Sequence, residues 1–96
     1  MARRIDRPDA DHIAILALGF IASEPERLER FLFLTGLAPE TVRSAAGEPG
    51  FLAAVLDHVA ADEALLRAFA GDNDLDPAVV GLAHAMLSRR SDEFGD

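Results

Sequence analysis

The sequence contains no cysteine and no lysine. Without a thiol there is no disulfide framework, no thiolate metal site and no cysteine nucleophile, so the fold must rest on the burial of apolar side chains. All nine basic residues are arginine, and 17 acidic residues give the chain a formal net charge of −8. Nucleic-acid phosphate and anionic lipid attract basic surfaces, so this balance disfavours both as partners.

The sequence also lacks a hydrophobic run long enough to cross a membrane. The apolar run at residues 13–22 is ten residues long, whereas a membrane-spanning helix needs about 20. Arginines precede this run, as they do in a secretion signal. However, Asp9 and Asp11 lie directly beside it, and bulky Phe20 stands where a cleavage site needs a small residue. We therefore expect a cytoplasmic protein.

The positions of the prolines divide the sequence into a series of short predicted helices. Its five prolines all stand where a helix would begin, a position at which the missing N–H costs nothing. No stretch alternates apolar and polar residues over several positions, so no sheet is expected. A chain of 96 residues forms one domain. The sequence therefore predicts an all-α, compact single-domain bundle of five or six short helices over residues 8–90, with a flexible N-terminus at 1–7 and a flexible C-terminal tail at 91–96.

Apolar residues recur at helical spacing, and each set is expected to face the core. The sets are Ile13, Leu16, Ala17, Phe20 and Ile21; Leu28, Phe31, Leu32 and Thr35; Phe51, Leu52, Val55, Leu56 and Val59; Leu65, Leu66 and Phe69; and Val79, Leu82, Ala83, Met86 and Leu87. The first helix also carries Ile15 and Leu18 on its other sides, which is typical of a central helix. Gly19 leaves a gap there, where we expect a neighbouring helix to approach closely.

Several residues have the character of helix caps. Residues 23–26, Ser-Glu-Pro-Glu, have the form of a capping box, in which the serine accepts a hydrogen bond from an early N–H of the next helix. Asp62 is expected to cap a later helix, in which Glu63 and Arg67 are spaced to form an ion pair. Gly71 is expected to end that helix.

Residues 28–46 contain a predicted helix corner. Gly36 can take the left-handed conformation that ends one helix, Leu37 can fold back on its last turn, and Pro39 starts the next helix within a few residues. We therefore expect Gly36, Leu37 and Pro39 to fix a tight corner between two packed helices.

This corner also matches the spacing of a DNA-binding helix-turn-helix. The matching positions are Leu32, Gly36, Leu37 and Val42. The same spacing occurs wherever two packed helices need a tight corner. The helix after the corner offers a single cation, Arg43, whereas phosphate contacts normally supply much of the affinity for DNA. We favour a structural corner, with DNA binding through residues 28–46 as the alternative.

Phe33 stands apart from the apolar stripe of its own helix, about 100° from the nearest member. A large apolar side chain in that position is either covered by another helix or by the tail, or it belongs to a contact surface. We favour coverage within the bundle. If it is exposed, Phe33 is the candidate contact for a partner protein, because aromatic residues are enriched at interface centres.

No pattern in the sequence indicates catalysis. Residues 72–76 resemble the start of a calcium loop, but Pro77 and Ala83 occupy the positions that need Gly and Glu. The serines lack the context of a nucleophile elbow, and no phosphate-binding loop is present. We expect no catalytic residue, no cofactor site, no metal site and no enzyme activity.

The three histidines, His12, His58 and His84, fall on three different predicted helices. His58 and Asp62 share a helix face if the helix extends that far, but two ligands do not make a metal site. His84 lies on the polar side of its helix, and we expect it to be exposed.

Four blocks of the sequence, together with the early apolar helix, carry a resemblance to a known family. They are residues 23–26, residues 30–37, residues 51–56 and the pair Asp62-Glu63. With these blocks the chain resembles a family of short bacterial proteins, found chiefly in alphaproteobacteria, that is described only as a domain of unknown function. The resemblance covers about residues 8–88. It implies a stand-alone cytoplasmic protein of this length and carries over no catalytic residue, ligand or partner.

The sequence does not specify a biological role, and it favours binding over chemistry. We expect a protein-protein interaction or regulatory module that uses a partly apolar surface, with another protein as its partner and with neither nucleic acid nor membrane. The sequence leaves open whether the chain is a monomer or a homodimer.

Overall fold

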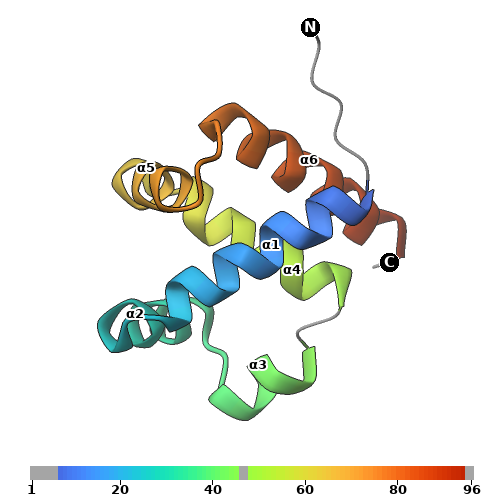
Figure 1. The fold of residues 1–96 in the computed structure, drawn as a ribbon. Coiled ribbons are helices and arrows are strands. Elements are labelled where there is room, and N and C mark those ends of the chain that lie inside the picture. The colour runs from blue at the N-terminus through green and yellow to red at the C-terminus, as the bar shows by residue number, and fades with distance from the viewer. Residues whose placement is uncertain (1–6, 46–47, 95–96) are drawn as a thin grey trace, which may run out of the picture.

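The computed structural model describes residues 7–45 and 48–94 of the chain (Figure 1). This part contains six α-helices and no strand, which confirms the predicted all-α bundle. The helices are α1 (Arg7–Ala22), α2 (Pro25–Thr35), α3 (Pro39–Ala45), α4 (Pro49–Ala60), α5 (Glu63–Asp72) and α6 (Pro77–Phe94). Apart from Arg7, the predicted flexible N-terminus lies outside the described residues.

Proline marks the start of the helices, as predicted. It is the first residue of α2, α3, α4 and α6, and Pro8 is the second residue of α1. These positions need no N–H donor, because the first four N–H groups of a helix have no partner within it. None of the helices in the described ranges is both long and apolar enough to cross a bilayer.

Helices α1, α4 and α6 form the centre of the bundle and make the most extensive contacts with one another; we call them the core layer. Figure 1 shows α1 crossing α4, with α6 running beside them. The predicted apolar face of α4 is buried in full, and that of α1 is buried except for the partly buried Leu16. Ala10, Ala14 and Ala17 are also fully buried, and these small side chains let α1 lie close to its neighbours.

The predicted face of α6 is wrong at one position. Val80 is fully buried with Ala83 and Leu87, whereas Leu82, which was expected to face inward, is 48% exposed. Two apolar stripes of the same spacing run along α6, and the pattern alone does not distinguish them. The helix also extends to Phe94, so residues 91–94 of the predicted tail are helical, as no proline or glycine occurs before Gly95.

The predicted capping box before α2 does not form. The residue before α2 is Glu24, and no side chain caps the helix. Ser23 instead donates its hydroxyl to the carbonyl of Phe20, at 2.7 Å, and so satisfies an acceptor at the end of α1. A serine between two closely spaced helices can form a hydrogen bond with either one, and here it bonds to the helix that precedes it.

The end of α5 also differs from the prediction. Gly71 lies inside α5, and the left-handed residue that follows the helix is Asp74, with φ 56°. The N–H of Leu75 bonds to the carbonyl of Ala70 at 2.8 Å, and the N–H of Asp74 to that of Gly71 at 3.4 Å. These two bonds form a Schellman motif. Aspartate tolerates the left-handed region better than most residues, so glycine is not required.

Candidate functional site

Helix α2 buries one apolar residue fully, packs Leu28 and Leu32 partly against the core, and exposes two others. Phe31 is fully buried, with its ring centroid 6.3 Å from that of Phe51 and 5.1 Å from the ring of His58. Phe33 is 84% exposed and Leu34 is 58% exposed; we call these two residues the outer patch. The expectation that Phe33 is covered within the bundle is therefore wrong. Helix α2 packs against α1, and Phe33 does not belong to the hydrophobic core.

The corner after α2 has the geometry that the sequence predicts. Gly36 ends α2 with φ 74°, and its N–H donates to the carbonyl of Leu32 at 2.8 Å. The hydroxyl of Thr35 donates to the carbonyl of Phe31 at 2.7 Å. Leu37 is partly buried against the core, and α3 begins at Pro39. This corner fixes the direction in which α3 leaves α2.

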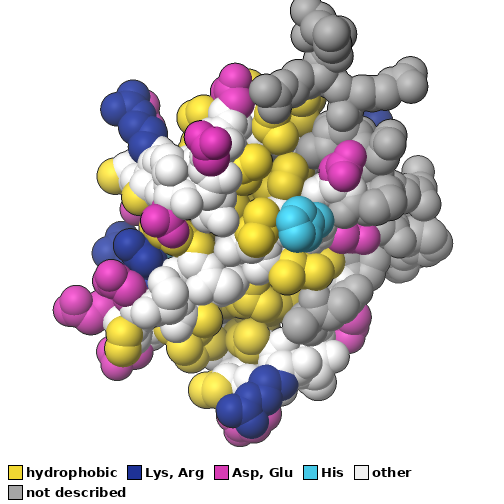
Figure 2. Space-filling model, viewed as in Figure 1, with side chains coloured by type: hydrophobic (Ala, Val, Ile, Leu, Met, Phe, Trp, Pro, Cys, Tyr) yellow, Lys and Arg dark blue, Asp and Glu magenta, His cyan; other side chains and the backbone are white. Residues whose placement is uncertain are grey.

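Apolar side chains also lie exposed outside α2. Figure 2 shows hydrophobic side chains in a band that crosses one face of the molecule, over α1 and toward α3, with acidic side chains at its edges. On α1, Ile15 is 52% exposed, and no atom of the described residues, apart from the neighbouring backbone of α1 itself, lies within 4 Å of where a side chain on Gly19 would begin. The predicted close approach at Gly19 is therefore wrong. Although α1 packs against α2, α4 and α6, its outer face is open.

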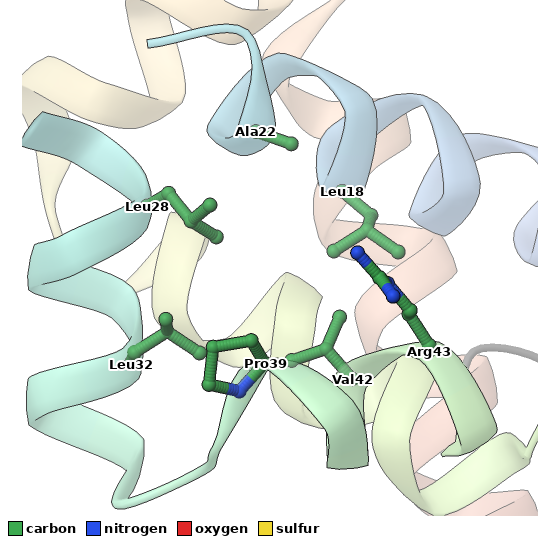
Figure 3. A pocket seen from close by; sticks show the side chains of 7 residues that line it. All are labelled: Leu18, Ala22, Leu28, Leu32, Pro39, Val42 and Arg43. Atoms are coloured by element: carbon green, nitrogen blue, oxygen red, sulfur yellow. The ribbon is translucent and has the colours of Figure 1, made fainter. Parts of the chain in front are cut away.

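A groove with a volume of about 340 Å³ lies between the end of α1, α2 and α3 (Figure 3). Its lining comes from all three helices. We call it the groove, and its residues are Leu18, Ala22, Leu28, Leu32, Pro39, Val42 and Arg43. It forms because the short link at residues 23–24 holds α2 beside α1, and the corner then turns α3 across the opening.

Arg43 is the only lining residue with a polar side chain. It is exposed, and within the described residues it forms no ion pair and no side-chain hydrogen bond. Arg27 is engaged differently. Its guanidinium lies 4.0 Å from the centre of the Phe20 ring and donates to the Phe20 carbonyl at 3.3 Å. Of these two arginines, Arg43 is therefore the one available to a ligand in the groove.

The histidines do not assemble into a site. His84 is half-buried and lies 3.3 Å from the carboxylate of Asp57, so the expectation that it is exposed is wrong. His58 lies against Phe31, and burial lowers its pKa; the nearby Arg30 lowers it further, against smaller opposing effects of Asp62 and Asp57. In the described ranges, no group of three or more His, Cys, Asp or Glu residues could hold a metal ion.

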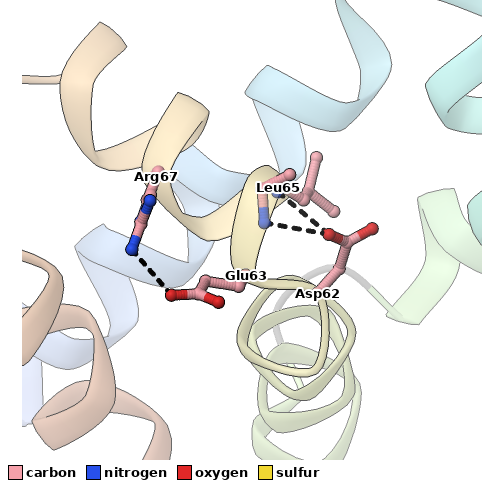
Figure 4. Close-up of polar contacts among 5 residues, drawn as sticks. Asp62, Glu63, Leu65 and Arg67 are labelled. Atoms are coloured by element: carbon pink, nitrogen blue, oxygen red, sulfur yellow. Dashed lines mark hydrogen bonds and ion pairs between the residues drawn. The ribbon is translucent and has the colours of Figure 1, made fainter.

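Asp62 caps the N-terminus of α5. Its Oδ1 accepts hydrogen bonds from the N–H groups of Ala64, at 3.1 Å, and Leu65, at 3.2 Å, as predicted for the cap of α5 (Figure 4). The predicted pair of Glu63 and Arg67 also forms, with 2.7 Å between Oε2 and Nη2. These carboxylates stabilise the start of α5.

Sequence reasoning missed the groove, although one signal for it was present. The apolar character of α1 on nearly every side is typical of a central helix, and it is also the signal for the groove. Leu18 and Ala22 form the wall of the groove. They are four residues apart, on the same side of the helix as Ile15, which is exposed.

Comparison with curated proteins gives no match, and comparison with solved structures gives none either. A family model does match, over residues 7–90, which is nearly the whole chain. The matched region includes the core layer up to Arg90, the outer patch and the groove. The chain therefore belongs to the family described as Protein of unknown function (DUF3572).

Proposed function

We propose that this chain is a small cytoplasmic protein-interaction module, without catalytic activity of its own, that binds a partner protein through the outer patch. The exposure of Phe33, at 84%, is the observation that carries this proposal. An exposed aromatic side chain contributes little to the stability of the fold. It contributes much to an interface, where aromatic anchors dominate the binding energy.

The neighbouring residues indicate the chemistry of the partner. Leu34 extends the apolar surface beside Phe33, while Glu26, Glu29 and a single cation, Arg30, are exposed on the same helix. The whole chain carries a net charge of −8. The surface that fits is therefore an apolar pocket with a basic rim, because complementary charge increases the rate of association and excludes wrong partners.

Substitution of Phe33 tests this proposal in affinity purification from the native cell, with mass spectrometry of the proteins that co-purify. We expect Phe33→Asp and Phe33→Gln to abolish recovery of the partner without unfolding the protein. The glutamine variant avoids the unfavourable placement of a negative charge near a helix C-terminus. Leu82→Asp is the matched control, since Leu82 is an exposed leucine on a different helix, and it should retain the partner.

Two results would contradict the proposal. One is recovery of the same proteins with wild type and both Phe33 variants. The other is unfolding of the Phe33→Gln variant, which would make Phe33 a structural residue. Recovery should also weaken as salt is raised, because the partner is expected to be basic around its apolar pocket.

DNA binding through residues 28–46 is the alternative, and the left-handed Gly36 at the corner favours it. Against it, α3 has seven residues and contributes one cation, Arg43, from a chain with a net charge of −8. A gel shift on genomic fragments across a salt series tests it directly. Binding that falls steeply with salt supports DNA recognition, and absence of binding at low salt excludes it.

A further inference from the structure

We infer that the groove binds a medium-chain aliphatic carboxylate. This inference does not depend on the proposed function, because the groove and the outer patch share no residue. It commits to one class of occupant, a small molecule with a hydrocarbon tail and an anionic end.

The apolar lining of the groove favours a ligand with a hydrocarbon tail. Six of the seven lining residues are apolar, so water in the groove finds almost no hydrogen-bond partner there. Displacing that water with a hydrocarbon chain is favourable, and the volume lies in the range of small-molecule sites. At about 30 Å³ for a water-sized group, a volume of about 340 Å³ holds roughly ten such groups, which is close to the size of octanoate.

Arg43 specifies the anionic end. Among the described residues, its guanidinium is the one charged group in the lining, and no carboxylate lines the groove. Figure 3 shows its side chain extending from α3 along the opening, so that the charge lies at one end of the apolar surface. A guanidinium donates two parallel hydrogen bonds to a carboxylate, a geometry that neither an alcohol nor an amide matches.

The walls of the groove come from the ends of the three helices that form it. Leu32 lies in the last turn of α2, where its carbonyl accepts the hydrogen bond of Gly36, and Pro39 is the rigid first residue of α3. Val42 packs partly against the core and holds the helix that carries Arg43.

The test is an amide NMR titration of the full chain with octanoate and, in parallel, with octanol. The two probes share a tail and differ in charge. We expect both to shift the amides of the groove residues, and octanoate to bind more tightly. Arg43→Gln should weaken octanoate binding about tenfold or more and leave octanol binding unchanged. Arg30→Gln is the matched control, because Arg30 is exposed on α2 and does not line the groove.

A second variant tests whether the hydrocarbon tail of the ligand lies in the groove. Ala22 is exposed at the end of α1 and lines the groove, so Ala22→Phe fills the space without disturbing the core. It should abolish binding of both probes while the protein stays folded. Phe33→Asp should leave octanoate binding unchanged, so the failure of this inference is distinguishable from failure of the proposed function.

Several outcomes would overturn the inference. They are the absence of saturable shifts at millimolar octanoate, equal affinity for octanoate and octanol, octanoate binding that survives Arg43→Gln unchanged, and shifts that map to the outer patch. Shifts in the groove that depend on protein concentration without any ligand would show that a second copy of the chain occupies it, and would also overturn the inference.

Discussion

The core layer and the helix corner use their apolar residues in opposite ways. In α1, α4 and α6 a continuous apolar face is buried against the other two helices. In the corner formed by α2 and α3, Phe31 is the one fully buried side chain, and α3 has none. The other apolar residues of the corner are partly buried or exposed, and several of the partly buried ones line the groove. Exposed apolar surface that is not needed for packing is typical of binding sites. The core layer therefore provides stability, and the corner provides the surface for binding.

The corner is the less firmly held of the two regions. An isolated helix of seven residues is unstable in water, so α3 depends on its few tertiary contacts. Phe31 attaches α2 to α4, because its ring lies against both Phe51 and His58. Regions with few buried contacts open at lower free energy than the core, and binding surfaces are commonly found there.

The largest expected effect contrasts two phenylalanines on one helix. Phe31→Ala should lower the free energy of unfolding by about 3–5 kcal/mol, because it removes a fully buried ring and leaves a cavity. Phe33→Ala should change it by no more than about 0.5 kcal/mol, because that side chain is 84% exposed. Urea denaturation of both variants measures the difference.

Similar losses for the two variants would remove the distinction between the inner and outer faces of α2. A loss from Phe33→Ala comparable with that from Phe31→Ala would mean that Phe33 is covered in solution. The outer patch would then be part of the fold, and the interaction proposal would lose its anchor.

Two glycines sharpen the comparison, because the same substitution should have opposite signs at them. Gly36→Ala should destabilise the protein by about 1–2 kcal/mol, since φ at this position is 74° and a Cβ is disfavoured there. Gly19→Ala should stabilise it by about 0.5–1 kcal/mol, since it lies within α1 with nothing within 4 Å of the new carbon. Thermal unfolding of both variants tests the signs, and a loss of stability for Gly19→Ala would contradict the open outer face of α1.

The sequence was sufficient to predict the fold class, the starts of the helices and the buried faces of α1 and α4. These features depend on local chemistry, such as proline at a first turn and apolar residues at helical spacing. The sequence was insufficient where two sets of apolar residues on one helix have the same spacing. Val79, Leu82 and Met86 repeat with the same spacing as Val80, Ala83 and Leu87, and only the packing of α6 on its neighbours decides that the second set is fully buried.

The candidate site was less predictable than the fold, for a related reason. Whether Phe33 is covered depends on where the other helices lie, and α2 alone carries no information on that. The groove is a property of three helices that meet, so no single stretch of sequence encodes it. The corner itself was predictable, because Gly36 and Pro39 act within one turn.

A smaller effect is expected at the start of α5, outside both regions. Asp62→Ala removes a side chain that accepts two backbone N–H groups, and should lower stability by about 1 kcal/mol. Ser23→Ala is the comparison, because Ser23 donates a single bond to the end of α1 and caps no N-terminus. It should cost less than Asp62→Ala. Equal losses in chemical denaturation would indicate that Ser23 also stabilises α2, as the capping box predicted.

His58 lies between the two regions and provides the last comparison. It belongs to α4, contacts Phe31 of α2, and has a pKa lowered by burial and by Arg30, with smaller opposing effects from Asp62 and Asp57. Because the folded protein binds this proton less readily than the unfolded chain, protonation favours unfolding. The contribution of His58 to stability is therefore constant above its ordinary pKa of about 6.5 and is lost progressively as the pH falls below that value.

Hydrogen exchange and thermal unfolding between about pH 7.5 and pH 5 test this prediction. We expect the amides of α2 and α3 to lose protection before those of α4 and α6, because the proton enters at the contact that attaches the corner to the core layer. His58→Gln should flatten the pH dependence, whereas His12→Gln, at an exposed histidine of α1, should preserve it. Uniform loss of protection across all six helices would instead mean that the corner and the core layer unfold as one cooperative unit.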